Sequence, residues 1–171
     1  MRSVPLPELL AAGAVRRWHT QAVRHEQTVA AHSWGVALIA LRLAGAEAPA
    51  EGRAQLLLLG LLHDAHEGTF GDTPYRAKAL LRSQGIDLDG RCAEAFWGPG
   101  GLDGAFAPWV RNLVAVADQL EAVAFASQNA PELAPLVAQE AYRCLCATFA
   151  APGQEALLAR AKDFLIQLWR R

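Results

Sequence analysis

The segment Gln55-Leu56-Leu57-Leu58-Leu59-Gly60-Leu61-Leu62-His63-Asp64-Ala65-His66-Glu67 decides the fold prediction, because it joins the most apolar run of the chain to a cluster of imidazoles and carboxylates. The run belongs to a helix predicted over residues 51–66, and its uninterrupted leucines imply burial on nearly all sides. We therefore expect this helix to be the central one. It should stop at Gly68, because glycine is a common helix-ending residue.

The rest of the chain also predicts helices. Its composition is 53% hydrophobic, and the alanine and leucine that dominate it favour helix over strand. A further helix should start at Pro74, capped by Asp72 or Thr73. Glycine and charge predict a loop over residues 85–104, with one short helix around residues 92–96. Other helices are predicted over residues 6–15, 27–43, 108–126, 131–149 and 154–170. Residues 1–171 should thus form a single all-α domain, a bundle of roughly six to eight helices.

Charge and cysteine content argue against several classes of protein. The net charge is −1, so the chain lacks the basic excess of a nucleic-acid-binding protein. Its longest apolar run is far shorter than the roughly 18 residues that cross a bilayer. The cysteine count is three, an odd number, and without framework spacing it indicates reduced thiols. We expect a cytoplasmic protein without a nucleic-acid or membrane partner.

Polar residues in apolar helices predict a metal site. His32 and Asp118 each lie in an otherwise apolar helix, and His63-Asp64 ends a third. Taken singly, His32 is read as a hydrogen-bonded core histidine and His63-Asp64 as a solvated helix end. A buried carboxylate is costly unless it is paired or bound to metal, so one shared metal explains all of these positions together. Glu67 should share a helical face with His63 and Asp64.

The order His32, His63-Asp64, Asp118 resembles the H…HD…D signature of HD-domain phosphohydrolases. The surrounding motifs are similar to those of bacterial 5′-deoxynucleotidases, and the resemblance covers roughly residues 16–126. These motifs are Arg17-Trp18, Thr28-Val29-Ala30-Ala31-His32-Ser33-Trp34, His63-Asp64-Ala65-His66-Glu67 and Gly71-Asp72-Thr73-Pro74. Ala31 departs from the pattern, because the family usually has a supporting glutamate before the metal-binding histidine. The short stretch between Asp64 and Asp118 looks more like the small phage-type dATP triphosphohydrolases.

The resemblance implies a divalent metal, Zn, Co, Mn or Mg, held by His32, His63, Asp64 and Asp118. A second metal near the phosphates is an open alternative. Glu67 would orient or deprotonate water, or protonate the leaving oxygen.

Other residues are expected to assist or to contact substrate. Asp72 would be a second catalytic carboxylate or a ligand of the second metal, unless it only caps the next helix. Arg17 and Lys78 would bind phosphate, although Lys78 could equally be a solvated lysine. Trp18 would lie against the sugar and favour its 2′-deoxy form, unless it only packs in the core. Thr20 would line the base site.

The expected substrate is therefore a small 2′-deoxynucleotide. Our first choice is a dATP-preferring triphosphohydrolase that yields deoxynucleoside and triphosphate, and the alternative is a 5′-deoxynucleotidase acting on monophosphates. Hydrolysis of guanosine tetraphosphate or cyclic dinucleotides, which other HD proteins perform, fits the motifs less well. A catalytically silent protein that binds metal or nucleotide is a remote alternative. The resemblance also implies a homo-oligomer from a bacterium or a phage-infected host.

Overall fold

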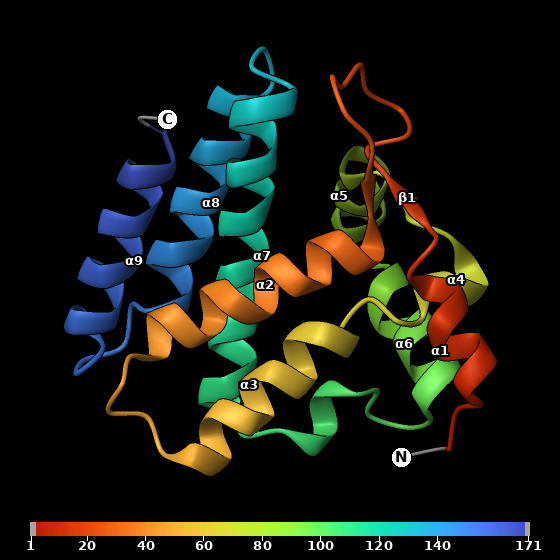
Figure 1. Cartoon of the computed structure of the whole chain (residues 1–171), viewed down its shortest axis with the longest axis horizontal. Helices are drawn as coiled ribbons and strands as arrows, with labels where there is room; N and C mark the ends of the chain where they lie inside the picture. Colours follow the sequence, from red (N-terminus) through yellow and green to blue (C-terminus); the bar gives the residue numbers. More distant parts are fainter. Residues whose placement is uncertain (1–2, 170–171) are drawn as a thin grey trace.

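The computed structural model describes residues 3–169, and almost all of its regular structure is helical (Figure 1). The predicted all-α class is confirmed. The described residues contain more helices than the six to eight predicted, because short segments that were not predicted as separate helices also form helical turns. The elements are α1 Leu6–Ala12, β1 Arg16–Arg17, β2 Gln27–Thr28, α2 Val29–Ala44, α3 Ala50–Leu62, α4 Glu67–Phe70, α5 Tyr75–Ser83, α6 Leu88–Trp97, η1 Asp103–Ala105, α7 Pro108–Asn129, α8 Ala134–Thr148 and α9 Glu155–Trp169.

Helix α7 is the central helix, and it packs against α2, α3, α8 and α9. Figure 1 shows α7, α8 and α9 side by side, with α2 running across them and α3 packed against the lower part of α7. The prediction that the leucine run would be central was wrong. Leu56 and Leu59 are buried, but Leu57, Leu58 and Leu61 are exposed. Helix α3 therefore buries one face only, at the period expected of an amphipathic helix.

Helices α2 and α3 cross closely at Gly60. A Cβ atom added to Gly60 would lie 2.8 Å from the Cα atom of Ala37, so the crossing requires a residue without a side chain at this position. Helix α2 begins where the Thr28 hydroxyl accepts a hydrogen bond from the backbone N–H of Ala31 (3.3 Å), which is an N-cap interaction. Residues 27 and 28 were predicted to be helical, but they form strand β2.

The chain leaves α3 earlier than predicted. The helix ends at Leu62, and residues 63–66 form tight turns that lead into α4. Gly68 does not stop a helix; Gly71 does, with a φ of 78° that glycine adopts without strain. Neither Asp72 nor Thr73 caps α5, because the cap residue is Pro74 and no side chain bonds the exposed N–H groups there. The side chain of Asp72 is thus not occupied by helix capping.

Three further segments surround the site. Strands β1 and β2 form an antiparallel hairpin with Arg17 opposite Gln27, and its loop carries Trp18 at a φ of 60°. Helix α6 is longer than the short helix predicted around residues 92–96. Within residues 3–169, no helix is both long and apolar enough to cross a membrane.

Candidate active site

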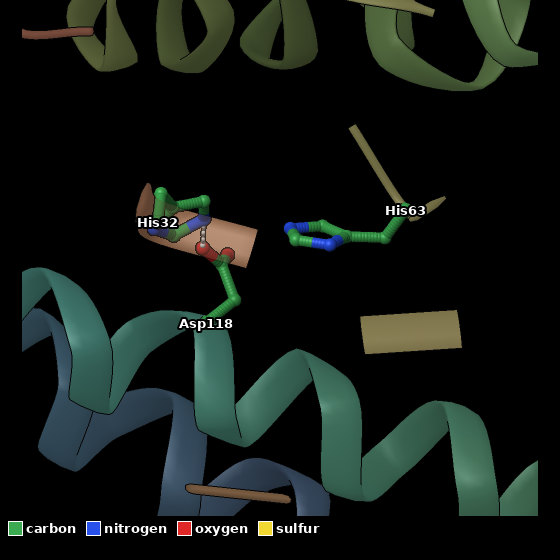
Figure 2. A group of neighbouring side chains, drawn as sticks. All are labelled: His32, His63 and Asp118. Atoms are coloured by element: carbon green, nitrogen blue, oxygen red, sulfur yellow. Dashed lines mark ion pairs between the residues drawn. The ribbon is translucent and has the colours of Figure 1, made fainter. Parts of the chain in front are cut away.

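Helices α2, α3 and α7 bring the predicted metal ligands together. His32 lies in α2, His63 caps the C-terminus of α3, and Asp118 lies in the middle of α7. One ligand atom from each of these side chains lies within 4.8 Å of the others (Figure 2). The Nε2 atom of His32 is 3.1 Å from Oδ1 of Asp118. Three side chains that are distant in sequence thus converge at one point.

The donor atoms at this point fit a divalent transition metal. The buried Nε2 atoms of His32 and His63 face the carboxylate oxygens of Asp118 and Asp64 at 3.1 and 3.2 Å, but neither contact has the geometry of a hydrogen bond. Burying such an atom unpaired costs about 1–3 kcal/mol, and a bound metal would remove that cost. Two imidazole nitrogens with a carboxylate oxygen suit zinc and the neighbouring first-row ions.

Asp64 lies at the same centre but pairs with Arg17. Its Oδ2 atom is 3.6 Å from Nε2 of His32 and 3.2 Å from Nε2 of His63. The same oxygen accepts a 2.8 Å hydrogen bond from Arg17. Burial raises the pKa of Asp64, but His63, Arg17 and His32 outweigh this effect and hold that pKa well below its usual value. Arg17 therefore touches the predicted ligand set directly.

The acidic neighbours of His63 raise the pKa of its imidazole. Burial lowers the pKa of His63, but Asp64 and Asp118 raise it more, to about 9. Its Nδ1 atom lies 2.9 Å from the carbonyl oxygen of Gly60. A carbonyl can only accept, so Nδ1 donates this bond. In the neutral ring, Nε2 then carries the lone pair that a metal requires.

The Nδ1 atom of His32 contacts a carboxylate that sequence reasoning missed. This carboxylate belongs to Glu121, one turn after Asp118 in α7. Ala31 is exposed, so the glutamate expected before His32 is replaced by one from another helix. Burial and Arg17 lower the pKa of His32, but Asp118 and Glu121 raise it more. The three-residue spacing between Asp118 and Glu121 was the available sequence signal.

Glu67 lies beside the centre, although not on the helix of His63 as predicted. It begins α4 and is 1% exposed. Burial and the nearby Asp64 carboxylate raise the pKa of Glu67 to about 8. Its Oε1 atom is 3.5 Å from Nζ of Lys78, whereas Oε2 is buried without a hydrogen-bond partner in the described chain. A group with this pKa holds a proton near neutral pH.

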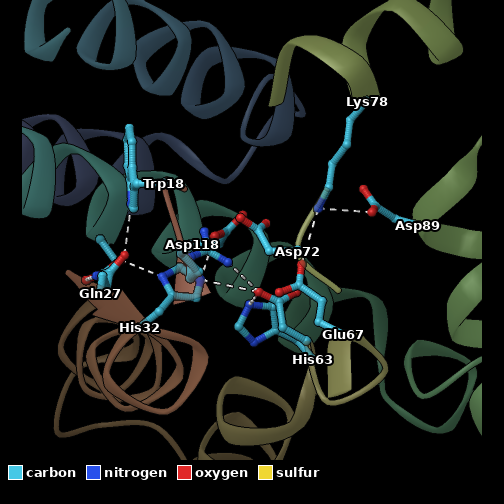
Figure 3. A network of polar contacts seen from close by, with 12 residues as sticks. Trp18, Gln27, His32, His63, Glu67, Asp72, Lys78, Asp89 and Asp118 are labelled. Atoms are coloured by element: carbon cyan, nitrogen blue, oxygen red, sulfur yellow. Dashed lines mark hydrogen bonds and ion pairs between the residues drawn. The ribbon is translucent and has the colours of Figure 1, made fainter. Parts of the chain in front are cut away.

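Lys78 bridges Glu67 to a second carboxylate, which comes from α6. Its Nζ atom is 3.0 Å from Oδ1 of Asp89, and Arg82 binds the other oxygen of Asp89 at 3.0 Å. Figure 3 shows Lys78 reaching from α5 toward the centre between Glu67 and Asp89. Lys78 is thus a paired, largely buried lysine. Sequence reasoning did not single out Arg82 or Asp89.

A cavity of about 400 Å³ opens onto the metal-ligand residues. Its basic lining residues are Arg17, Lys78, Arg82 and Arg111, and its acidic ones are Asp64, Asp87, Asp89, Glu94, Asp103 and Asp118. Arg111 was not predicted to belong to the site. A cavity with cations beside the candidate metal ligands can hold a small phosphorylated molecule.

The remaining predicted residues come from the β1–β2 hairpin and the segment before α5. Trp18 is half-buried, stacks on Phe125 with ring centroids 5.4 Å apart, and lines a second cavity of about 350 Å³. Asp72 is largely buried and lies 3.5 Å from His19. Thr20 is exposed and is not among the lining residues of either cavity.

Comparisons with known proteins match a part of the chain to a family and to a relative. Residues 29–91 match the model of the HD domain family. A dATP triphosphohydrolase from Salmonella phage PMBT28 is 32% identical over 124 residues, which cover 68% of this chain. The chain spans 62% of the length of that relative.

A solved structure shares the fold. It is the HD phosphohydrolase DatZ of cyanophage S-2L, described as bound to dA and one catalytic Zn²⁺ ion. The TM-score is 0.76 at 22% identity, and the match covers all of both chains. The matched segment 29–91 contains His32, His63 and Asp64, and α7 supplies Asp118. The resemblance that the motifs predicted is therefore confirmed for residues 29–91, which match the HD domain family, and the chain shares its fold with DatZ.

Proposed function

We propose that this protein is a metal-dependent phosphohydrolase of 2′-deoxynucleotides, and that dATP is its preferred substrate. One observation carries the proposal: the buried Nε2 atoms of His32 and His63 converge with Asp118 beside a cavity that is partly lined by basic side chains. The dATP triphosphohydrolase of the Salmonella phage supports the substrate. The products would be deoxynucleoside and inorganic triphosphate.

The proposed metal ligands are His32, His63, Asp64 and Asp118. A divalent metal would lower the pKa of water and stabilise negative charge that develops on a phosphoryl oxygen. Arg17 would hold phosphate oxygens beside Asp64, to which it already donates a hydrogen bond. Lys78 would add a second positive charge on the cavity wall.

Glu67 is the proposed proton donor. In the reaction, water attacks the α-phosphorus and the bond from that phosphorus to the 5′-oxygen breaks. The leaving 5′-oxygen needs a proton, and burial together with Asp64 keeps the pKa of Glu67 at about 8. A carboxyl group with this pKa has a proton to give near neutral pH. Asp72 would assist from the segment before α5, where it is not used as a helix cap.

The similarity to a dATP triphosphohydrolase favours a triphosphate over a monophosphate, and four basic residues could contact its phosphates. Arg17, Lys78, Arg82 and Arg111 line one cavity, and each additional phosphate needs more positive charge nearby. The metal identity, a second metal, the base contact of Thr20, the homo-oligomer and the cytoplasmic location stay predictions.

A hydrolysis panel tests the proposed function. The protein would be supplied with zinc, cobalt, manganese or magnesium and given dATP, dAMP, their ribonucleotide counterparts and other deoxynucleotides, with products separated by chromatography. We expect deoxyadenosine and triphosphate from dATP. Phosphate from monophosphates alone would instead indicate a 5′-deoxynucleotidase. If no nucleotide is hydrolysed with any of these metals, the proposed function is wrong.

Trp18 should set the preference for a deoxy sugar. An apolar ring offers no partner to a ribose 2′-hydroxyl, whose burial without a hydrogen bond is unfavourable. Replacing Trp18 by alanine should therefore reduce the ratio of kcat/KM for dATP over ATP, by up to about 100-fold. The measurement is kcat/KM on both nucleotides for wild type and variant. An unchanged ratio would assign Trp18 to packing against Phe125 alone.

A further inference from the structure

Four side chains form a continuous hydrogen-bonded line from the hairpin to the candidate metal site. The Nε1–H of Trp18 donates to Oε1 of Gln27 at 2.9 Å. The Nε2–H of Gln27 donates to Oε1 of Glu121 at 2.7 Å. The other oxygen of Glu121 contacts Nδ1 of His32. The line thus ends on the histidine whose opposite nitrogen, Nε2, faces Asp118.

Each bond in this line has only one possible direction. The indole of Trp18 can only donate, so it must meet the oxygen of the Gln27 amide. The amide nitrogen of Gln27 then points at Glu121, whose carboxylate can only accept. The remaining oxygen of Glu121 also accepts, so Nδ1 of His32 must carry a hydrogen. In the neutral imidazole, this leaves the lone pair on Nε2, the atom beside Asp118.

The line is built into the core. Gln27, His32 and Glu121 are 5%, 0% and 8% exposed, so water does not compete for these bonds. Gly35 makes room for the line, because a Cβ atom there would lie 2.8 Å from Cγ of Glu121. The contacts join residues of the hairpin, α2 and α7.

We propose that Glu121 is a positioning residue: its carboxylate fixes the tautomer of His32 that presents Nε2 to a metal, and the Gln27 amide, oriented by the indole of Trp18, holds that carboxylate in place. This inference rests on the metal site of the proposed function. It also connects the residue proposed to contact the sugar with a metal ligand. Carboxylates that hold a ligating histidine in this way commonly change metal affinity by about 10–100-fold when they are replaced.

The variant Glu121→Gln tests the inference, because it keeps the shape and replaces an accepting oxygen by a donating nitrogen. If that nitrogen faces His32, Nδ1 must accept, and the hydrogen moves to Nε2, where it blocks the metal. If it faces Gln27 instead, the Gln27 amide must turn, and its nitrogen then opposes the indole N–H of Trp18. We expect zinc affinity to fall about 10–100-fold.

The double variant Trp18→Phe with Glu121→Gln separates this network from general damage. Phenylalanine has no N–H, so the Gln27 amide can turn and the residue at 121 can offer its oxygen to His32. The double variant should recover most of the lost zinc affinity, whereas Trp18→Phe alone should bind zinc like the wild type. Glu132→Gln, a change at an exposed position, is the matched control.

Zinc affinity would be measured by competition with a chromophoric chelator, with circular dichroism to check folding. Equal affinity for Glu121→Gln and Glu132→Gln overturns the inference, and so does a double variant no better than Glu121→Gln. If Glu121→Gln does not fold, the ¹⁵N–¹H long-range NMR spectrum of the metal-free wild type decides: hydrogen on Nδ1 of His32 supports the inference, and hydrogen on Nε2 alone overturns it. A wild type that binds no zinc refutes the proposed metal site itself.

Discussion

Replacing His63 by alanine is expected to abolish nucleotide hydrolysis and to weaken zinc binding. The loss of zinc affinity should exceed the factor of about 10–100 that is typical when a residue supporting a ligand is replaced. His63 contributes a buried Nε2 atom that lies 3.2 Å from Asp64 without forming a hydrogen bond of good geometry. Without it, the carboxylates of Asp64 and Asp118 lose a positive or metal-binding neighbour. Isothermal titration of zinc into the metal-free variant, beside the hydrolysis assay with dATP, would measure both losses.

His25→Ala is the matched control for this prediction. His25 is exposed and lies outside the lining of both cavities, so its variant should keep the zinc affinity and rate of the wild type. The variant at His63 gives up a hydrogen bond to Gly60, worth roughly 1 kcal/mol, and leaves Asp64 paired with Arg17, so circular dichroism would check its folding. Wild-type zinc affinity in a folded His63→Ala variant would remove His63 from the metal site.

Replacing Glu67 by glutamine should reduce kcat by roughly 10²–10⁴-fold, the range for loss of a general acid or base. The amide has the same shape and can still face Lys78, but it has no proton to give at neutral pH. Zinc affinity should stay close to that of the wild type, because Glu67 is not among the proposed ligands. Steady-state kinetics and zinc titration on the same preparation would measure the two quantities separately.

The outcomes for Glu67→Gln discriminate among its possible roles. Lost hydrolysis with retained zinc supports a proton donor. Loss of both would make Glu67 a metal ligand, and loss of neither would remove it from the reaction. Glu132→Gln again serves as the control at an exposed position. A wild type that binds zinc and nucleotide without turnover would favour the silent binding protein.

The helical class and the main candidate ligands could be predicted from the sequence, because both depend on the types of residue in short segments. Alanine and leucine favour helix wherever they occur. His32 and Asp118 stand out because each interrupts an apolar helix, where an unpaired polar group is costly. The motifs around His63 added the resemblance to HD-domain proteins, which the match of residues 29–91 confirms.

Local patterns failed where a neighbour distant in sequence decides the outcome. Leu57 and Leu58 are as apolar as Leu56, yet only Leu56 of the three is buried. The helix predicted through His66 ends at Leu62, and the turns that follow bring Glu67 to the site from a separate element. Composition does not show whether the chain continues as helix or leaves it through turns, because the same types of residue occur in both.

By itself, the sequence determined the helical fold and the inward position of the residues that would bind a metal. Only the tertiary structure decided what supports and surrounds them. Glu121 reaches His32 from 89 positions away, Gln27 reaches Glu121 from 94, and Asp89 approaches Lys78 from α6. The physical reason is that a hydrogen bond depends on distance and direction in space. Both arise only when helices far apart in the chain pack against each other.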